Sequence, residues 1–230
     1  MSTPLIEPVP SDGVSATAQI VAALTQAIVS HRLQPGSKLS EQTLADQFGV
    51  SRTLVRQALF QLSQQRLIRM EKARGAFVAS PSANEARQVF AVRRMLEAEM
   101  VRALVRQITP RHIKTLQSHI KQEKAALRRN DTAERTKLLR DFHVRMAELM
   151  GNQVLAELLE ALISRCSLIT LMYQSTRAAE HSSEEHVAIV QALAAHDEAL
   201  ALRLMDEHLQ HVQAGLDFAS PTTTPTTTSH

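Results

Sequence analysis

Hydrophobic residues recur at helical spacing along almost the whole chain. Before residue 65 this spacing predicts helices over 15–31, over 41–48 and from 52 onward. It is interrupted at 67–70 and 76–79, which we predict to be two short strands. Beyond residue 83 the helical period returns in six segments: 84–107, 110–129, 132–150, 152–177, 182–195 and 197–218. The pattern predicts a mainly α fold, with a small strand pair near its first third.

The second and third predicted helices are joined by a tight turn. Ser40 and Ser51 are suitable N-caps for them, and Gly49 can adopt the left-handed conformation that ends the first. Arg52, Thr53 and Arg56 stand at the start of the next helix. A helix N-terminus attracts phosphate, and an arginine fork fits a guanine edge. This arrangement is typical of a helix-turn-helix that binds DNA.

The strand pair that follows predicts a wing. Its turn, Glu71 to Gly75, is basic and contains a glycine, so backbone can approach a sugar closely and Arg74 can enter a minor groove. We therefore predict a winged helix-turn-helix followed by an antiparallel bundle of six to seven helices. The expected domains are a disordered start at 1–13, a DNA-binding domain at 14–79, a linker at 80–83, a second, helical domain at 84–218 and a disordered tail at 219–230.

The distribution of charge supports a nucleic-acid partner. The formal net charge of the 230 residues is only +3. Residues 1–80, however, contain eight Lys and Arg and five Asp and Glu, whereas residues 81–230 contain 18 basic and 18 acidic residues. All of the net positive charge therefore lies in the segment that the pattern assigns to DNA.

The compartment follows from the cysteine content and the N-terminus. The one cysteine, Cys166, permits no internal disulfide, which favours a reducing cytoplasm; we expect it to act as a small buried hydrophobe. No stretch is apolar for long enough to suggest a membrane span, and Met1 to Gly13 lacks the pattern of a secretory signal.

The N-terminal motifs resemble one known family. From Thr17 to Val78 the chain is similar to the winged helix-turn-helix of GntR-type bacterial transcription regulators. The matching residues are Leu33-Gln-Pro-Gly-Ser-Lys-Leu39, Ser40-Glu41, Leu44-Ala45, Phe48-Gly49-Val50-Ser51-Arg52-Thr53, Val55-Arg56, Ala58-Leu59, Leu62 and Arg74-Gly75-Ala76-Phe77-Val78. The chain has Leu54, Gln57 and Gln65-Arg66 where the family usually has Pro, Glu and Glu-Gly. The predicted DNA-binding residues are Gln42, Ser51, Arg52, Thr53, Arg56, Arg74 and Gly75.

The second half resembles the all-helical effector-binding domain of the FadR subfamily within that family. The similar segments are Val92–Glu97, Asp141-Phe142-His143 with Gly151-Asn152, Glu185–Ile189 and Met205–Leu209. This resemblance implies a homodimer that binds a near-palindromic operator in double-stranded DNA and responds to a small-molecule effector. We expect a repressor that a metabolite such as an organic acid releases from DNA.

Three histidines lie on the inward stripes of three different predicted helices. They are His143, His186 and His208, and imidazole is the commonest neutral ligand for zinc and its neighbours. In the family that the chain resembles, these positions commonly hold metal ligands. We therefore predict a divalent metal ion, zinc or nickel. The family's usual carboxylate position is occupied by Leu139, and Asp141 faces away from the stripe. Histidines acting as hydrogen-bonding groups of a metal-free pocket are the alternative.

Other polar residues are candidates for effector contact. Arg93 leads, because its position in the motif often faces the ligand in the family and its fork suits a carboxylate. Arg94, Arg165, Tyr173 and His211 are further candidates. We expect no ligand role for five further histidines, which have polar surroundings in the sequence: His31, His112, His119, His181 and His196.

Three alternatives compete with a metal-binding regulator: a hydrolase, a regulator that works without a metal, and a helical scaffold with a vestigial DNA-binding fold. A metal-dependent hydrolase could use three histidines and a bound water, but the chain has no His-Glu-x-x-His, and a hydrolase does not explain the wing. A regulator that senses a nucleobase or another small molecule without a metal is the second alternative. The motifs and their order favour a non-enzymatic, ligand-responsive transcription regulator.

Overall fold

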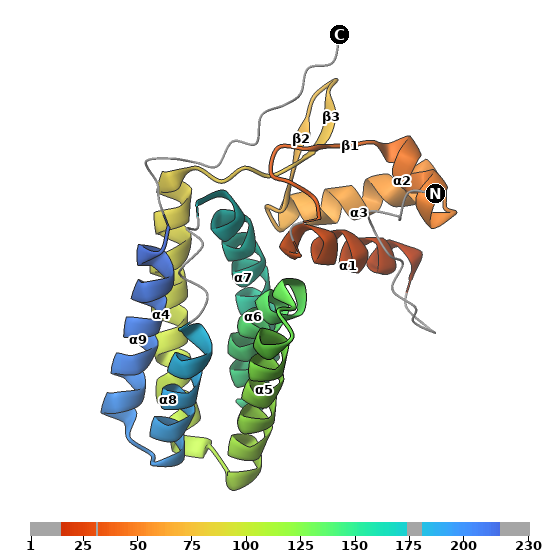
Figure 1. Cartoon of the computed structure of the whole chain (residues 1–230). Coiled ribbons are helices and arrows are strands. Elements are labelled where there is room, and N and C mark those ends of the chain that lie inside the picture. Colours follow the sequence, from red (N-terminus) through yellow and green to blue (C-terminus); the bar gives the residue numbers. More distant parts are fainter. Residues whose placement is uncertain (1–14, 31, 174–180, 217–230) are drawn as a thin grey trace.

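The computed structural model describes residues 15–30, 32–173 and 181–216, and it is mainly helical (Figure 1). The segments predicted to be disordered, 1–13 and 219–230, lie outside the described residues, as does His31. A winged helix-turn-helix precedes a helical bundle, which confirms the predicted fold class. No helix among the described residues is long and apolar enough to cross a membrane.

The three N-terminal helices begin and end where the sequence places their caps. They are α1 (Ala16–Val29), α2 (Glu41–Phe48) and α3 (Arg52–Gln64). Ser40 Oγ accepts from the Thr43 amide and Ser51 Oγ from the Leu54 amide, so each hydroxyl satisfies one free amide of its helix. Gly49 ends α2 with φ 64°, in the left-handed region that glycine tolerates best.

The wing is part of a three-stranded antiparallel sheet in the order β1-β3-β2. Its hairpin consists of β2 (Ile68–Glu71) and β3 (Gly75–Val78), with Glu71 opposite Gly75. The short β1 (Lys38–Leu39) pairs with β3 on its other side. From the sequence, these two residues were expected to belong to an extended turn. A strand of two residues is too short to show an alternating pattern, and only its hydrogen bonds to a partner strand define it.

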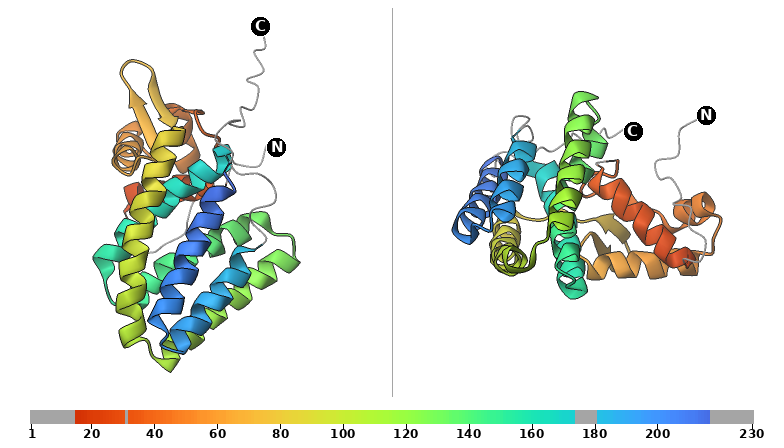
Figure 2. Two further views of the ribbon diagram at one scale, coloured as in Figure 1. Left: turned by 90° about the vertical axis from the view of Figure 1, so that its left-hand side faces the viewer. Right: turned by 90° about the horizontal axis from the view of Figure 1, so that it is seen from below.

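Within the described residues from 83 onward, six helices form the second part of the molecule: α4 (Ala83–Gln107), α5 (Pro110–Arg128), α6 (Thr132–Leu149), α7 (Gln153–Tyr173), α8 (Ser182–Ala194) and α9 (Glu198–Ala214). They pack side by side as a bundle below the winged part (Figures 1 and 2). α4 and α7 run antiparallel: Arg165 pairs with Glu85, and the Tyr173 hydroxyl donates to the Pro81 carbonyl oxygen.

Each half buries its own apolar cluster. The winged part closes around residues such as Leu24, Leu59 and Leu62, and the bundle around Phe142, Met146 and Leu193. Leu168, on α7 of the bundle, is fully buried and belongs to the winged part's cluster. Because α7 also contributes Ile163, Cys166 and Thr170 to a cavity inside the bundle, one helix touches both the cavity and the winged part.

Candidate functional site

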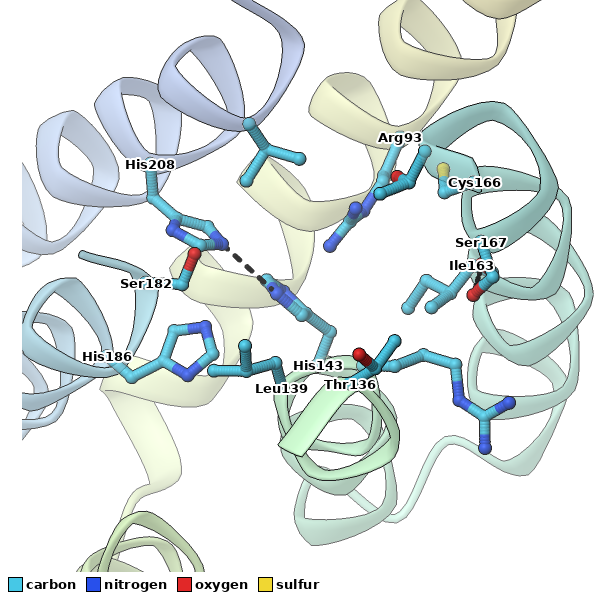
Figure 3. Close-up of a pocket in the computed structure, with 13 residues that line it drawn as sticks. Arg93, Thr136, Leu139, His143, Ile163, Cys166, Ser167, Ser182, His186 and His208 are labelled. Atoms are coloured by element: carbon cyan, nitrogen blue, oxygen red, sulfur yellow. Dashed lines mark hydrogen bonds between the residues drawn. The ribbon is translucent and has the colours of Figure 1, made fainter. Parts of the chain in front are cut away.

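Three imidazoles from three helices converge inside the bundle. His143 lies on α6, His186 on α8 and His208 on α9, and all three are buried (Figure 3). The Nε2 atoms of His143 and His208 are 3.3 Å apart, and one ring nitrogen of each histidine lies within 4.8 Å of the other two. Nε2 of His186 is buried and has no hydrogen-bond partner among the described residues. Buried ring nitrogens that face one another, and not hydrogen-bonding groups of other residues, can bind one cation together.

A carboxylate stands behind each of the three imidazoles. Glu97 Oε2 lies 2.5 Å from Nδ1 of His143, Glu123 Oε1 lies 3.0 Å from Nδ1 of His186, and Glu185 Oε2 lies 2.6 Å from Nδ1 of His208. A ring that donates its Nδ1 proton to a carboxylate keeps the lone pair of Nε2 for the centre. Metal-binding histidines are commonly oriented in this way.

The surroundings keep His143 and His186 neutral. Burial lowers the pKa of His143 to about 3, and it lowers the pKa of His186 well below its usual value. Burial acts to raise the pKa of Glu97, but the charge of Arg93 and the hydrogen bond from His143 hold that pKa at about 2. These two imidazoles therefore enter the centre as unprotonated bases, the form in which a histidine binds a metal.

The carboxyl group of Glu123 differs from Glu97, because burial raises its pKa to about 7. It also lies near His119, whose Nε2 is 2.8 Å from the Leu138 carbonyl oxygen and 3.5 Å from Glu123 Oε1. His119 is buried. Its neighbours in the chain are polar, so a solvated position was expected from the sequence. In the fold, however, the side of α5 that carries His119 packs against α6.

The histidines line a cavity of about 110 Å³ together with Arg93 and Leu139. The hydroxyl-bearing residues Thr136, Ser167, Thr170 and Ser182 line it as well. Leu139 thus lines the cavity at the position where the family usually has a carboxylate. Asp141 does not line the cavity, and its carboxylate accepts hydrogen bonds from Arg140. Cys166 is buried, as expected, and is also part of the wall.

Of the predicted effector residues, Arg93 lies in this cavity (Figure 3). Its Nε donates to Glu97 Oε1 at 2.5 Å, so Arg93, Glu97 and His143 form one buried chain of polar contacts. The other candidates do not line the cavity. Arg94 pairs with Asp206, Arg165 with Glu85 and His211 with Glu185, and Tyr173 contacts the linker.

Sequence reasoning missed the three carboxylates and Arg140, which lines the cavity from α6. Glu97 and Glu123 are acidic residues on otherwise inward-facing helical stripes, and this was the available signal. Glu97 lies four residues after Arg93, and Glu123 four residues after His119, so each shares a face with another buried polar residue. Which helix they would meet could not be read from that spacing.

All seven predicted DNA-binding residues are exposed. Gln42 lies on α2, Ser51, Arg52, Thr53 and Arg56 lie at or near the start of α3, and Arg74 and Gly75 lie at the tip of the wing. The guanidinium of Arg74 lies 5.4 Å from the ring centre of Phe77, which supports it from the neighbouring strand. The wing hairpin and the short helices form one end of the molecule (Figure 1).

Comparison with known proteins assigns both halves. Residues 16–78 match the model of the bacterial regulatory proteins of the gntR family, and residues 88–211 match the FCD domain. The chain is 27% identical over 195 residues to the transcriptional repressor RspR of Escherichia coli, covering 84% of this chain and 86% of that protein. It is 25% identical over 201 residues to the gluconate operon repressor of Bacillus subtilis, covering 85% and 82%.

Solved structures agree on the fold. Escherichia coli McbR superposes with a TM-score of 0.78 at 24% identity, covering 87% of this chain and 96% of that one. A GntR regulator from Rhodococcus sp. RHA1 gives a TM-score of 0.77 at 24% identity, with 87% and 97% covered. These relatives are regulators and not enzymes, which argues against the hydrolase alternative. The chain belongs to the GntR family of bacterial transcription regulators, in the FadR-like group whose helical half is an FCD domain.

Proposed function

We propose that this ligand-responsive regulator is a cytoplasmic repressor that a small organic acid releases from DNA. The observation that carries the proposal is the pairing of two separate sites in one chain: an exposed helix-turn-helix with two arginines on α3, and a cavity lined by three buried histidines and Arg93. α7 contacts the cavity on one side and places Leu168 in the core of the winged part on the other. A change in the cavity can therefore bias the position of the DNA-binding helices.

On the DNA side, Arg56 and Arg52 are assigned to base and phosphate contacts in the major groove, and Arg74 and Gly75 to the adjacent groove. Both α3 arginines are exposed by about 60%, with side-chain values of 60% for Arg52 and 62% for Arg56. One short helix reads few base pairs, so two copies are needed to specify an operator. We infer a homodimer on a near-palindromic site.

In the bundle, His143, His186 and His208 are proposed to hold a divalent ion, zinc or nickel. The residues fit such an ion: three buried nitrogens face one another, one of them is unpaired among the described residues, and each ring is held by a carboxylate. Metal binding is also common among FCD domains. A bound ion supplies a positive centre with coordination positions left for water or an effector oxygen.

Arg93 is proposed to hold the far end of the effector. Its Nε is engaged with Glu97 and its side chain lines the cavity, where a guanidinium N–H can bind an anion, and the hydroxyl-bearing residues of the cavity wall can accept or donate hydrogen bonds. A cavity of about 110 Å³ limits the part of the ligand that enters it to a small group. A metal-free sensor of a nucleobase or another small molecule remains the second candidate, because the same hydroxyl groups suit it.

The test begins with DNA from upstream of the protein's own gene, with binding measured by gel shift at several salt concentrations. We expect Arg56→Ala to weaken specific binding on the order of 10- to 100-fold. Undiminished affinity of Arg56→Ala at physiological salt contradicts the assignment of α3 to the groove.

The cavity is tested separately by metal analysis of protein purified without chelator or nickel resin. A thermal-shift screen of organic acids and nucleobases follows, on metal-loaded and metal-stripped protein. We expect an organic acid to stabilise the loaded form and to release DNA. Tight effector binding by the stripped protein supports the metal-free alternative instead.

A further inference from the structure

Glu41 links the two helices of the helix-turn-helix. It is the first residue of α2, and its carboxylate reaches the exposed face of α3. Arg56 donates from Nε to Oε1 at 3.0 Å and from Nη2 to Oε2 at 2.7 Å, and Arg52 Nη2 lies 3.4 Å from Oε2. The carboxylate side chain is 19% exposed, whereas the two arginine side chains are largely exposed. An acidic residue therefore stands beside the arginine that we assign to base reading.

The geometry of the pair leaves Arg56 free to read a base. A guanidinium carries five N–H groups, and this side-on contact uses the one on Nε and one of the two on Nη2. Both N–H groups of Nη1 and the second one of Nη2 remain at the end of the fork. Guanine accepts a pair of hydrogen bonds at O6 and N7 from such an end. The ion pair and a guanine contact can therefore exist together.

The charge of Glu41 has a cost for DNA binding. The hydrogen bond from Arg56 and the charges of both arginines lower the pKa of Glu41, so it stays anionic at neutral pH. A carboxylate at this face repels phosphates and weakens binding to any sequence. The ion pair also has a benefit. Without it, the long, exposed Arg56 side chain would sample many conformations, whereas a guanidinium held by Glu41 loses less conformational entropy when it binds a base.

We propose that Glu41 is a positioning residue for sequence reading, which holds Arg56 side-on so that the end of its fork meets a guanine. The inference rests on the proposed role of Arg56 in the major groove. It predicts that Glu41 trades general affinity for DNA against discrimination between sequences. A carboxylate that merely stabilised the fold would leave the base preference unchanged when it is replaced.

The test compares Glu41→Gln with the wild type on two duplexes: the sequence that the wild type selects from a randomised pool, and a scrambled version of it. We expect the ratio of the two affinities to fall about tenfold, because the charge-assisted contact is lost. Binding to the scrambled duplex should strengthen, and the slope of log affinity against log salt should steepen by about one. Asp46→Asn is the matched control, since Asp46 carries the same charge on the same helix and accepts from Gln42.

Two further variants keep the test decisive. Glu41→Asp preserves the charge but shortens the reach, so we expect it to lose discrimination without gaining affinity for the scrambled duplex. In an Arg56→Ala background, Glu41→Gln should cause no further loss of discrimination. Thermal unfolding of each variant verifies that it is folded.

The outcomes separate the inference from the proposal beneath it. Undiminished binding by Arg56→Ala contradicts the role of α3 itself. Weakened binding by Arg56→Ala together with unchanged discrimination by Glu41→Gln overturns only the positioning role. A loss that persists in the Arg56→Ala background also overturns it, because Glu41 would then contact a base directly, as a carboxylate can with the amino group of cytosine.

Discussion

Glu97 Oε2 lies 2.5 Å from Nδ1 of His143, and both side chains are almost completely buried. The same carboxylate accepts from Arg93 at its other oxygen. One residue of α4 thus connects the predicted effector-binding arginine to a predicted metal ligand of α6. The contact fixes the ring so that Nε2 faces the centre of the three histidines.

The first prediction is that Glu97→Gln lowers metal affinity about 10- to 100-fold. The amide oxygen of the glutamine would face the Arg93 donor, so its nitrogen would face His143. An amide nitrogen donates and cannot accept the Nδ1 proton, so the ring would carry its proton on Nε2, which then has no lone pair for a metal. Leaving Arg93 buried without its partner charge should also cost about 3 to 5 kcal/mol of folding stability. Metal titration of the folded protein, alongside the exposed control Glu99→Gln on the same helix, measures the effect. Unchanged metal affinity would show that Glu97 serves Arg93 alone.

Leu139→Asp restores the carboxylate at a position that lines the cavity. We expect the variant to bind the metal more tightly, because an anionic ligand joins three neutral ones. It should bind an anionic effector less well, since the carboxylate takes the position left for it. Competition with a fluorescent zinc chelator and effector titration by thermal shift measure the two effects. Leu139→Asn, which is nearly the same size but neutral, is the control; equal behaviour of both variants contradicts the charge argument.

Four large apolar side chains are exposed on the neighbouring helices α4 and α7. Val92 and Met95 are exposed by 44% and 69%, and Val154 and Leu158 by 68% and 52%. Counting along both helices from the Arg165–Glu85 pair puts Leu158 level with Val92 and Val154 close to the level of Met95. Large apolar side chains that are exposed at similar levels of neighbouring helices are candidates for a protein interface.

We therefore expect Met95→Glu to yield a monomer in light scattering at micromolar concentration, because an unpaired carboxylate is costly to bury between two subunits. Operator affinity should fall with the loss of the second recognition helix. Gln117→Glu adds the same charge to an exposed position of α5 and should leave the dimer intact. A dimeric Met95→Glu protein would place the subunit contact elsewhere.

Arg66 adopts φ 61°, a left-handed conformation that disfavours any side chain with a β-carbon. It stands where the family that the sequence resembles usually has glycine. Arg66→Gly should therefore stabilise the fold by about 0.5 to 1 kcal/mol, after the greater freedom of glycine in the unfolded chain is deducted. Urea unfolding measures the change. Arg66→Ala removes the charge but keeps the β-carbon, so an equal gain in both variants would attribute the effect to charge instead of backbone strain.

Much of the local structure follows from the sequence alone. Ser40, Ser51 and Gly49 act on amides and turns within a few residues of themselves, so their roles as helix boundaries follow from local chemistry. The inward stripes that carry His143, His186 and His208 follow from helical period in the same way. The winged fold follows from the order of these elements and from the family resemblance that they carry.

The tertiary structure decided which polar groups meet. Glu97 is 46 residues from His143, and Glu123 is 63 residues from His186. Their contacts depend on the axial register and rotation of helices packed against each other, and a helical period does not set either quantity. The same reason explains why Arg165 and Tyr173, although aligned on α7, do not line the cavity: Arg165 contacts Glu85 at the start of α4, and Tyr173 contacts Pro81 in the linker. Likewise Glu41 meets Arg56 only because the turn at Gly49 sets α2 across α3, so the sequence determined the groups on each helix and packing determined their partners.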